Sequence, residues 1–126
     1  MSHFCYFLAL PGVVMPHAQN LIEALSVGSI PIIHEEYAQL MIPNLKHMHN
    51  AIVYNDLEDL PDKIKLAYNL DDKVLSEMIN NASKYYQENL SVSTVVNKIT
   101  SNEYDLIYLQ AEYWSVDILK NALSKN

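Results

Sequence analysis

Three polar residues recur at intervals of three along one predicted helix near the N-terminus, and together they could bind a phosphorylated ligand. They are His17, Asn20 and Glu23. The start of a helix carries unpaired N–H groups and about half a positive charge, so a phosphate is stabilised there, and His17 could add a hydrogen bond. Asn20 and Glu23 could meet other polar parts of the ligand, and a carboxylate suits ribose hydroxyls. The alternative interpretation of the same spacing is a solvent-exposed helix flank.

Two adjacent carboxylates, Glu35 and Glu36, follow a predicted apolar strand and could supply a general base. Neighbouring side chains of a strand point in opposite directions, so the two would not act as a pair. A solvated turn is the alternative for both. Because ligands of open parallel sheets bind beyond the carboxyl ends of the strands, Glu35 is included among the candidate ligand-binding residues.

A metal site is not expected from the histidines. His47 and His49 form a compact pair, but the segment His34–Tyr37 lacks the second histidine that a zinc-binding helix carries, and no pair of cysteines is present. We expect His47 and His49 to lie in a solvated loop. The lone Cys5 lies in an apolar run, which favours a buried structural thiol and a reducing compartment.

These candidates fall on a predicted β–α–β unit. Residues 4–10 form a continuous aromatic and aliphatic run, the pattern of a strand that is buried on both faces of a parallel sheet. A Pro-Gly pair that includes Gly12 ends this run, and residues 17–27 then keep apolar side chains at helical spacing. Gly28 is suited to end that helix in a left-handed conformation. Residues 30–33 predict the second strand.

The remainder of the chain is predicted to be mainly helical after a third short strand over residues 51–54. The expected helices cover residues 57–70, 71–90, 91–100 and 102–124. The last of them has apolar residues at helical spacing, at Ile107, Ala111, Trp114, Ile118 and Ala122, although the segment 104–108 also alternates like a strand. We therefore predict one α/β domain over residues 1–126, a Rossmann-like single lobe with a short parallel sheet flanked by helices. Its βαβ core would span residues 1–55, and its helical C-terminal half would span residues 56–126.

A specific order of features runs through residues 11–33. It consists of the turn Pro11-Gly12, a helix bearing the pair Glu23-Ala24, then Gly28, and the hydrophobic-proline-hydrophobic strand Ile30-Pro31-Ile32. This order resembles the nucleotide-sugar-binding segment of GT-B glycosyltransferases, particularly the exostosin-like ones. Tyr37 and Pro43 are similar to the tyrosine and proline that follow this strand in exostosin-like sequences. The close resemblance covers about residues 4–45.

The resemblance implies a donor-binding lobe. Glu23 would hold the ribose of a nucleotide sugar, the helix start at His17 would meet the diphosphate, Asn20 would contact phosphate or sugar, and Gly12 would lie close to the sugar. Such enzymes use no bound metal, and the helix dipole would stabilise the departing diphosphate. The expected reaction is glycosyl transfer to a saccharide or other hydroxyl acceptor, in partnership with an N-terminal lobe that this chain lacks.

Charge and composition exclude other partners. Fifteen acidic residues against eight lysines give a net charge of −7, which repels nucleic acid and anionic membranes. No apolar run reaches the roughly 18 residues of a membrane span, so we expect a cytoplasmic protein. The alternative function is a non-catalytic interaction module that binds another chain, identical or different, or an inactive glycosyltransferase fragment.

Overall fold

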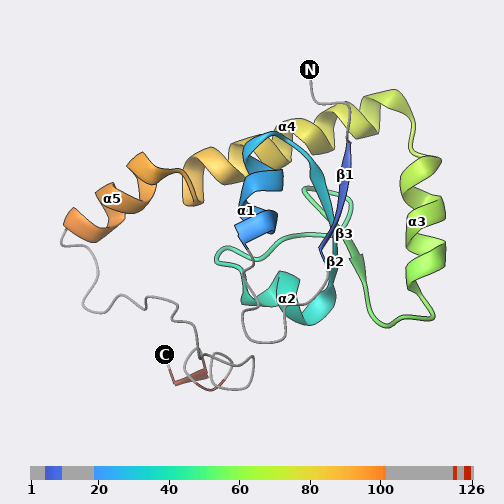
Figure 1. The fold of residues 1–126 in the computed structure, drawn as a ribbon, viewed down its shortest axis with the longest axis horizontal. Coiled ribbons are helices and arrows are strands. Elements are labelled where there is room, and N and C mark those ends of the chain that lie inside the picture. Colours follow the sequence, from blue (N-terminus) through green and yellow to red (C-terminus); the bar gives the residue numbers. More distant parts are fainter. Residues whose placement is uncertain (1–4, 10–18, 102–120, 122–123, 126) are drawn as a thin grey trace.

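A computed structural model describes residues 5–9, 19–101, 121 and 124–125. Its sheet has three parallel strands in the order β1-β2-β3: β1 (Tyr6–Ala9), β2 (Ile30–His34) and β3 (Ile52–Tyr54). The helices are α1 (Gln19–Ser26), α2 (Glu35–Leu40), α3 (Leu60–Tyr68), α4 (Asp72–Asn89) and α5 (Val92–Thr100). The predicted fold class, a Rossmann-like α/β lobe with a short parallel sheet flanked by helices, is confirmed (Figure 1).

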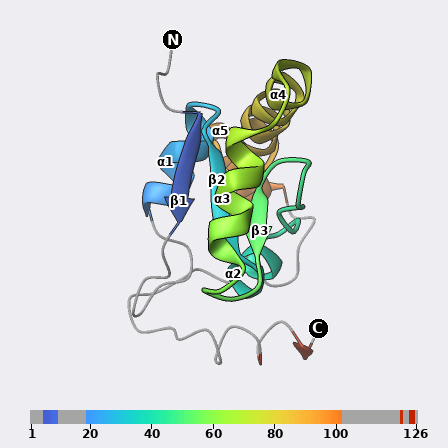
Figure 2. The ribbon, with the colours of Figure 1, turned by 90° about the vertical axis from the view of Figure 1, so that its right-hand side faces the viewer.

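The central strand β2 is covered on both faces, which explains its uninterrupted apolar sequence. Ile30 and Ile32 lie in a core cluster with residues of β3, α3 and the first half of α4. Ile33 lies in a second cluster with residues of α1, α2 and the second half of α4. Figure 1 shows α1 and α3 on opposite sides of the strands, and in Figure 2 α3 lies in front of them.

Helix α4 lies across the end of the sheet where β2 begins. Gly28 has a φ of +75°, and a Cβ at this position would lie 2.7 Å from the Ser83 Oγ of α4. The left-handed glycine after α1 is therefore confirmed, and the missing side chain also allows α4 to approach closely. In Figure 1, α4 runs past the amino ends of the strands, whereas α2 lies at the opposite end.

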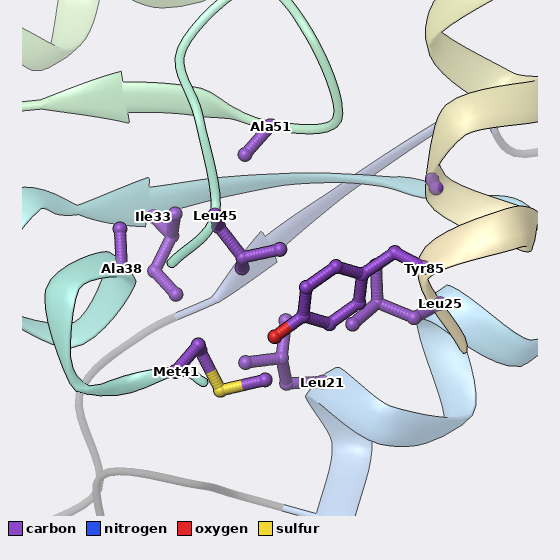
Figure 3. Packing of buried hydrophobic residues seen from close by; sticks show 9 residues of the cluster. Leu21, Leu25, Ile33, Ala38, Met41, Leu45, Ala51 and Tyr85 are labelled. Carbon is purple, nitrogen blue, oxygen red and sulfur yellow. The ribbon is translucent and has the colours of Figure 1, made fainter. Parts of the chain in front are cut away.

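Tyr85 anchors α4 to the second cluster. It is 5% exposed and packs beside Leu21 and Leu25 of α1 (Figure 3). Its hydroxyl donates a hydrogen bond of 2.7 Å to the Pro43 carbonyl oxygen. Burial raises the pKa of Tyr85 to about 12, so the hydroxyl keeps the proton that it donates at ordinary pH. The contact ties α4 to the loop that follows α2.

The helix α2 differs from the sequence prediction, which gave a strand end or turn at Glu35 and Glu36. Both glutamates lie in the first turn of α2 instead, where negative charge is favourable. The helix forms because the Nδ1 of His34 accepts a hydrogen bond of 3.2 Å from the Glu36 N–H, and because Ala38 is buried. The prediction failed because a histidine cap is not among the usual sequence signals.

The other predicted elements are confirmed with shifted bounds. The helix α3 begins at Leu60 rather than residue 57, because Asp56 accepts a hydrogen bond of 2.8 Å from the Asp59 N–H and holds a turn there. Asp71 and Ser91 cap α4 and α5. The start of the predicted helix at residue 17 and the helix expected over residues 102–124 lie outside the described residues, apart from the few positions near the C-terminus. No described helix is both long enough and apolar enough to cross a membrane.

Candidate functional site

The carboxyl end of the sheet is the candidate site. The last residues of β2 and β3 both have ring side chains, and these rings are in contact. His34 of β2 pairs in register with Tyr54 of β3. The two rings meet edge to face with centroids 5.4 Å apart. The ring of Tyr37 in α2 also meets the His34 ring edge to face, with centroids 6.2 Å apart. Tyr54 is buried, whereas His34 and Tyr37 are half-buried. We call these three residues the His34 cluster.

The hydrogen bond at the start of α2 fixes the tautomer of His34. A backbone N–H can only donate, so the Nδ1 that accepts from Glu36 carries no proton. In the neutral ring the proton is therefore on Nε2. His34 consequently offers an N–H donor at the end of the central strand, from a ring that packing holds in place.

Acidic groups surround this end of the sheet. Glu35 is exposed and accepts a hydrogen bond of 3.1 Å from the Gln39 amide. Beyond β3, Asp59 accepts a bond of 3.1 Å from the Asn55 N–H and lies 3.8 Å from the Lys63 ammonium. Carboxylates repel an anionic phosphate and can accept hydrogen bonds from hydroxyl groups, and Lys63 offsets part of the charge of Asp59.

Two of the candidate residues lie on α1, at its solvent side. Asn20 and Glu23 are exposed, whereas Leu21 and Leu25 of the same helix are buried. Because α1 returns from the carboxyl end of β1 to the amino end of β2, its first turn lies at the same end of the sheet as His34. The candidates Gly12 and His17 lie outside the described residues.

The site residues share one end of the sheet but not one face. Glu35 opens α2, and α2 packs through Ala38 into the cluster that also holds α1. His34 alternates with Ile33 and therefore points to the opposite face, where Tyr54 lies. Tyr37 joins the two sides, because it contacts the His34 ring and also packs against the cluster that holds α1.

The loop that holds Lys46, His47 and His49 lies at the other end of β3. The Lys46 carbonyl accepts a hydrogen bond from the Ala51 N–H directly before this strand. The loop after α2 therefore carries Lys46 to the amino end of β3, away from the candidate site. The exposure of His47 and His49 agrees with the predicted solvated loop.

The two loop histidines have separate partners. The His47 Nδ1 accepts a hydrogen bond of 3.0 Å from the Val53 N–H, and the His49 carbonyl accepts one of 3.0 Å from the Asn81 amide. Within the part of the chain that the structure describes, no three histidine, cysteine or acidic side chains are grouped to hold a metal ion. Cys5 is half-buried and makes no disulfide.

The chain was compared with protein families, curated proteins and solved structures. No family model matches the chain, and the searches of curated proteins and of solved structures found no match. The candidate site is therefore inferred from residue chemistry and local geometry. Sequence reasoning placed the segment His34–Tyr37 beside the ligand crevice, but it did not indicate the helix cap and the ring contacts that His34 makes.

Proposed function

We propose that the chain is the donor-binding lobe of a glycosyltransferase and that it binds a nucleoside diphosphate sugar at the carboxyl ends of its parallel strands. The observation that supports this most is the parallel β1-α1-β2 unit with one end covered by α4 and polar side chains at the other. Ligands of open parallel sheets bind at that second end. The resemblance of residues 11–33 to a nucleotide-sugar-binding segment supplies the class of ligand.

The exposed polar residues divide between the two parts of such a ligand. Glu23 accepts hydrogen bonds from the ribose hydroxyls, and Asn20 donates to phosphate or sugar. Glu35 accepts from sugar hydroxyls, and the Nε2–H of His34 donates to a sugar oxygen. The resemblance assigns the diphosphate to the helix start at His17 and the sugar to the neighbourhood of Gly12, two residues that lie outside the described part of the chain.

The proposed reaction breaks the bond between the anomeric carbon of the sugar and the diphosphate oxygen. A new bond forms between that carbon and the acceptor oxygen, the acceptor proton passes to a base, and the nucleoside diphosphate leaves. This lobe holds the donor without a metal ion, and fixed dipoles stabilise the leaving group. The acceptor, which is a saccharide or another hydroxyl compound, and the base belong to a partner lobe.

The role of Glu23 is tested by the variant Glu23→Gln. Loss of a charged hydrogen-bond acceptor costs roughly 1.5–3 kcal/mol, so the dissociation constant of UDP or GDP should rise about tenfold or more. The affinities are measured by NMR titration of the two proteins. Glu77→Gln, at an exposed position on α4, is the matched control and should leave the affinity unchanged. Equal affinities in all three proteins would remove Glu23 from the site.

The second candidate function, a non-catalytic interaction module, is favoured by the exposed edge of the sheet. The strand β1 is apolar throughout but lies at an edge, and Leu8 is 39% exposed. Within the described residues no strand pairs with its outer side. An edge strand offers backbone N–H and C=O groups to a strand of another chain. A folded chain that ignores nucleotides but associates through β1 would favour this function.

A further inference from the structure

The helix α5 carries an apolar stripe that no described residue covers. Val92, Val95, Val96 and Ile99 follow the i, i+3, i+4, i+7 spacing of one helix face, and their side chains are 76%, 38%, 50% and 49% exposed. No residue of α5 is buried. Figure 1 shows α5 extending away from the sheet beyond the end of α4. A helix with one apolar face normally buries that face against another element.

The stripe has a fixed direction because α5 is firmly joined to α4. The Ser91 Oγ accepts a hydrogen bond of 3.4 Å from the Thr94 N–H and caps α5. The hydroxyls of Ser91 and Thr94 also donate to the Gln87 carbonyl of α4, at 3.0 and 2.7 Å. These bonds hold the two helices together, so the stripe presents one defined surface.

The small size of the stripe argues against a separate protein as its occupant. A stable interface between two proteins buries roughly 800 Å² and about 20–30 residues on each side. Four aliphatic side chains fall well below that size. A segment of the same chain needs no such area, because the tether gives it a high effective concentration.

The chain supplies a suitable segment directly after α5. Residues 102–126 follow without interruption, and their sequence places Ile107, Ala111, Trp114 and Ile118 at helical spacing. Charge is complementary as well: α5 carries Lys98 and no acidic residue, whereas the segment has four acidic residues and two lysines. We propose that the C-terminal segment, residues 102–126, covers the α5 stripe of its own molecule with these apolar side chains.

Trp114 makes the proposal directly measurable, because it is the only tryptophan of the chain. In the 126-residue chain its fluorescence should be blue-shifted and protected from acrylamide. Val96→Lys places a charge at the centre of the stripe and should shift the emission to the red and increase quenching. Asn97→Lys, on the polar face of the same helix, adds the same charge and should leave the emission unchanged.

A second variant and the molecular mass keep the test decisive. Val92→Lys replaces the most exposed residue of the stripe, where folding does not depend on the side chain, and should also shift the emission to the red. The mass measured by light scattering should remain that of a monomer, and the emission should not depend on concentration. Unchanged emission in both stripe variants would overturn the proposal, and so would a concentration-dependent dimer that both variants dissolve.

Discussion

The neutral ring of His47 accepts a hydrogen bond from the backbone. Its Nδ1 accepts from the Val53 N–H in β3, a bond that exists only while this nitrogen is unprotonated. Partial burial of the His47 ring lowers its pKa below the ordinary value of 6.5, and Lys63 lowers it further, while Asp59 opposes the shift. Protonation therefore competes with the start of the third strand.

The lowered pKa predicts a pH dependence of stability. Below pH 6.5 the unfolded chain takes up a proton at His47 that the folded chain resists, so the contribution of His47 is present above pH 6.5 and is lost as the pH falls below it. We expect His47→Gln to flatten the pH dependence of the urea midpoint on the acidic side. The measurement is urea unfolding at several values between about pH 5 and pH 8. His49→Gln is the control, and equal pH profiles for both variants would contradict the role of His47.

At the site, the sequence predicted the positions of some residues and not of others. Asn20 and Glu23 could be placed on the solvent side of α1, because the apolar spacing of Leu21 and Leu25 defines the buried side. The cap formed by His34 could not be predicted, because it depends on the strand ending at that residue. The position of Lys46 depends on the direction of a loop, which local sequence does not determine.

At the scale of elements, the contact between Gly28 and α4 joins the β–α–β unit to the helical half. Periodicity and turn residues predicted the strands, α3, α4 and α5, because each has one repeating apolar pattern and a recognisable cap. The packing of α4 against Gly28 is a contact between distant parts of the chain, and no local pattern contains it. Gly28 thus has two roles, of which sequence reasoning found only the conformational one.

The two roles of Gly28 can be separated by substitution. Gly28→Ala should lower the free energy of unfolding by about 1–2 kcal/mol from the left-handed backbone alone, and the contact of 2.7 Å with the Ser83 Oγ adds to this loss. Combining it with Ser83→Ala removes that contact but not the backbone cost. Urea unfolding of both single variants and the double variant measures the two parts. A Gly28→Ala protein as stable as the parent would contradict both.

At the scale of the whole molecule, the two ends of the sheet differ in what covers them. Helix α4 passes the amino end of β2, while α2 and the first turn of α1 lie at the carboxyl end (Figure 1). The His34 cluster is at this carboxyl end as well. The fold class could be predicted from the sequence because a β–α–β order is compatible with only a few topologies. Which end α4 covers followed only from the structure. This asymmetry is the reason that we propose the carboxyl end of the sheet as the ligand site.

The measurement that tests this account most directly is a titration of the isotope-labelled full chain with UDP and then GDP, in the presence of a metal chelator and followed by two-dimensional NMR. We predict that signals of Asn20, Glu23, His34 and Glu35 move, that those of the Lys46 loop do not, and that the two nucleotides differ in affinity. A folded spectrum that stays unchanged at millimolar nucleotide, or shifts confined to the amino end of the sheet, would contradict the proposed donor site.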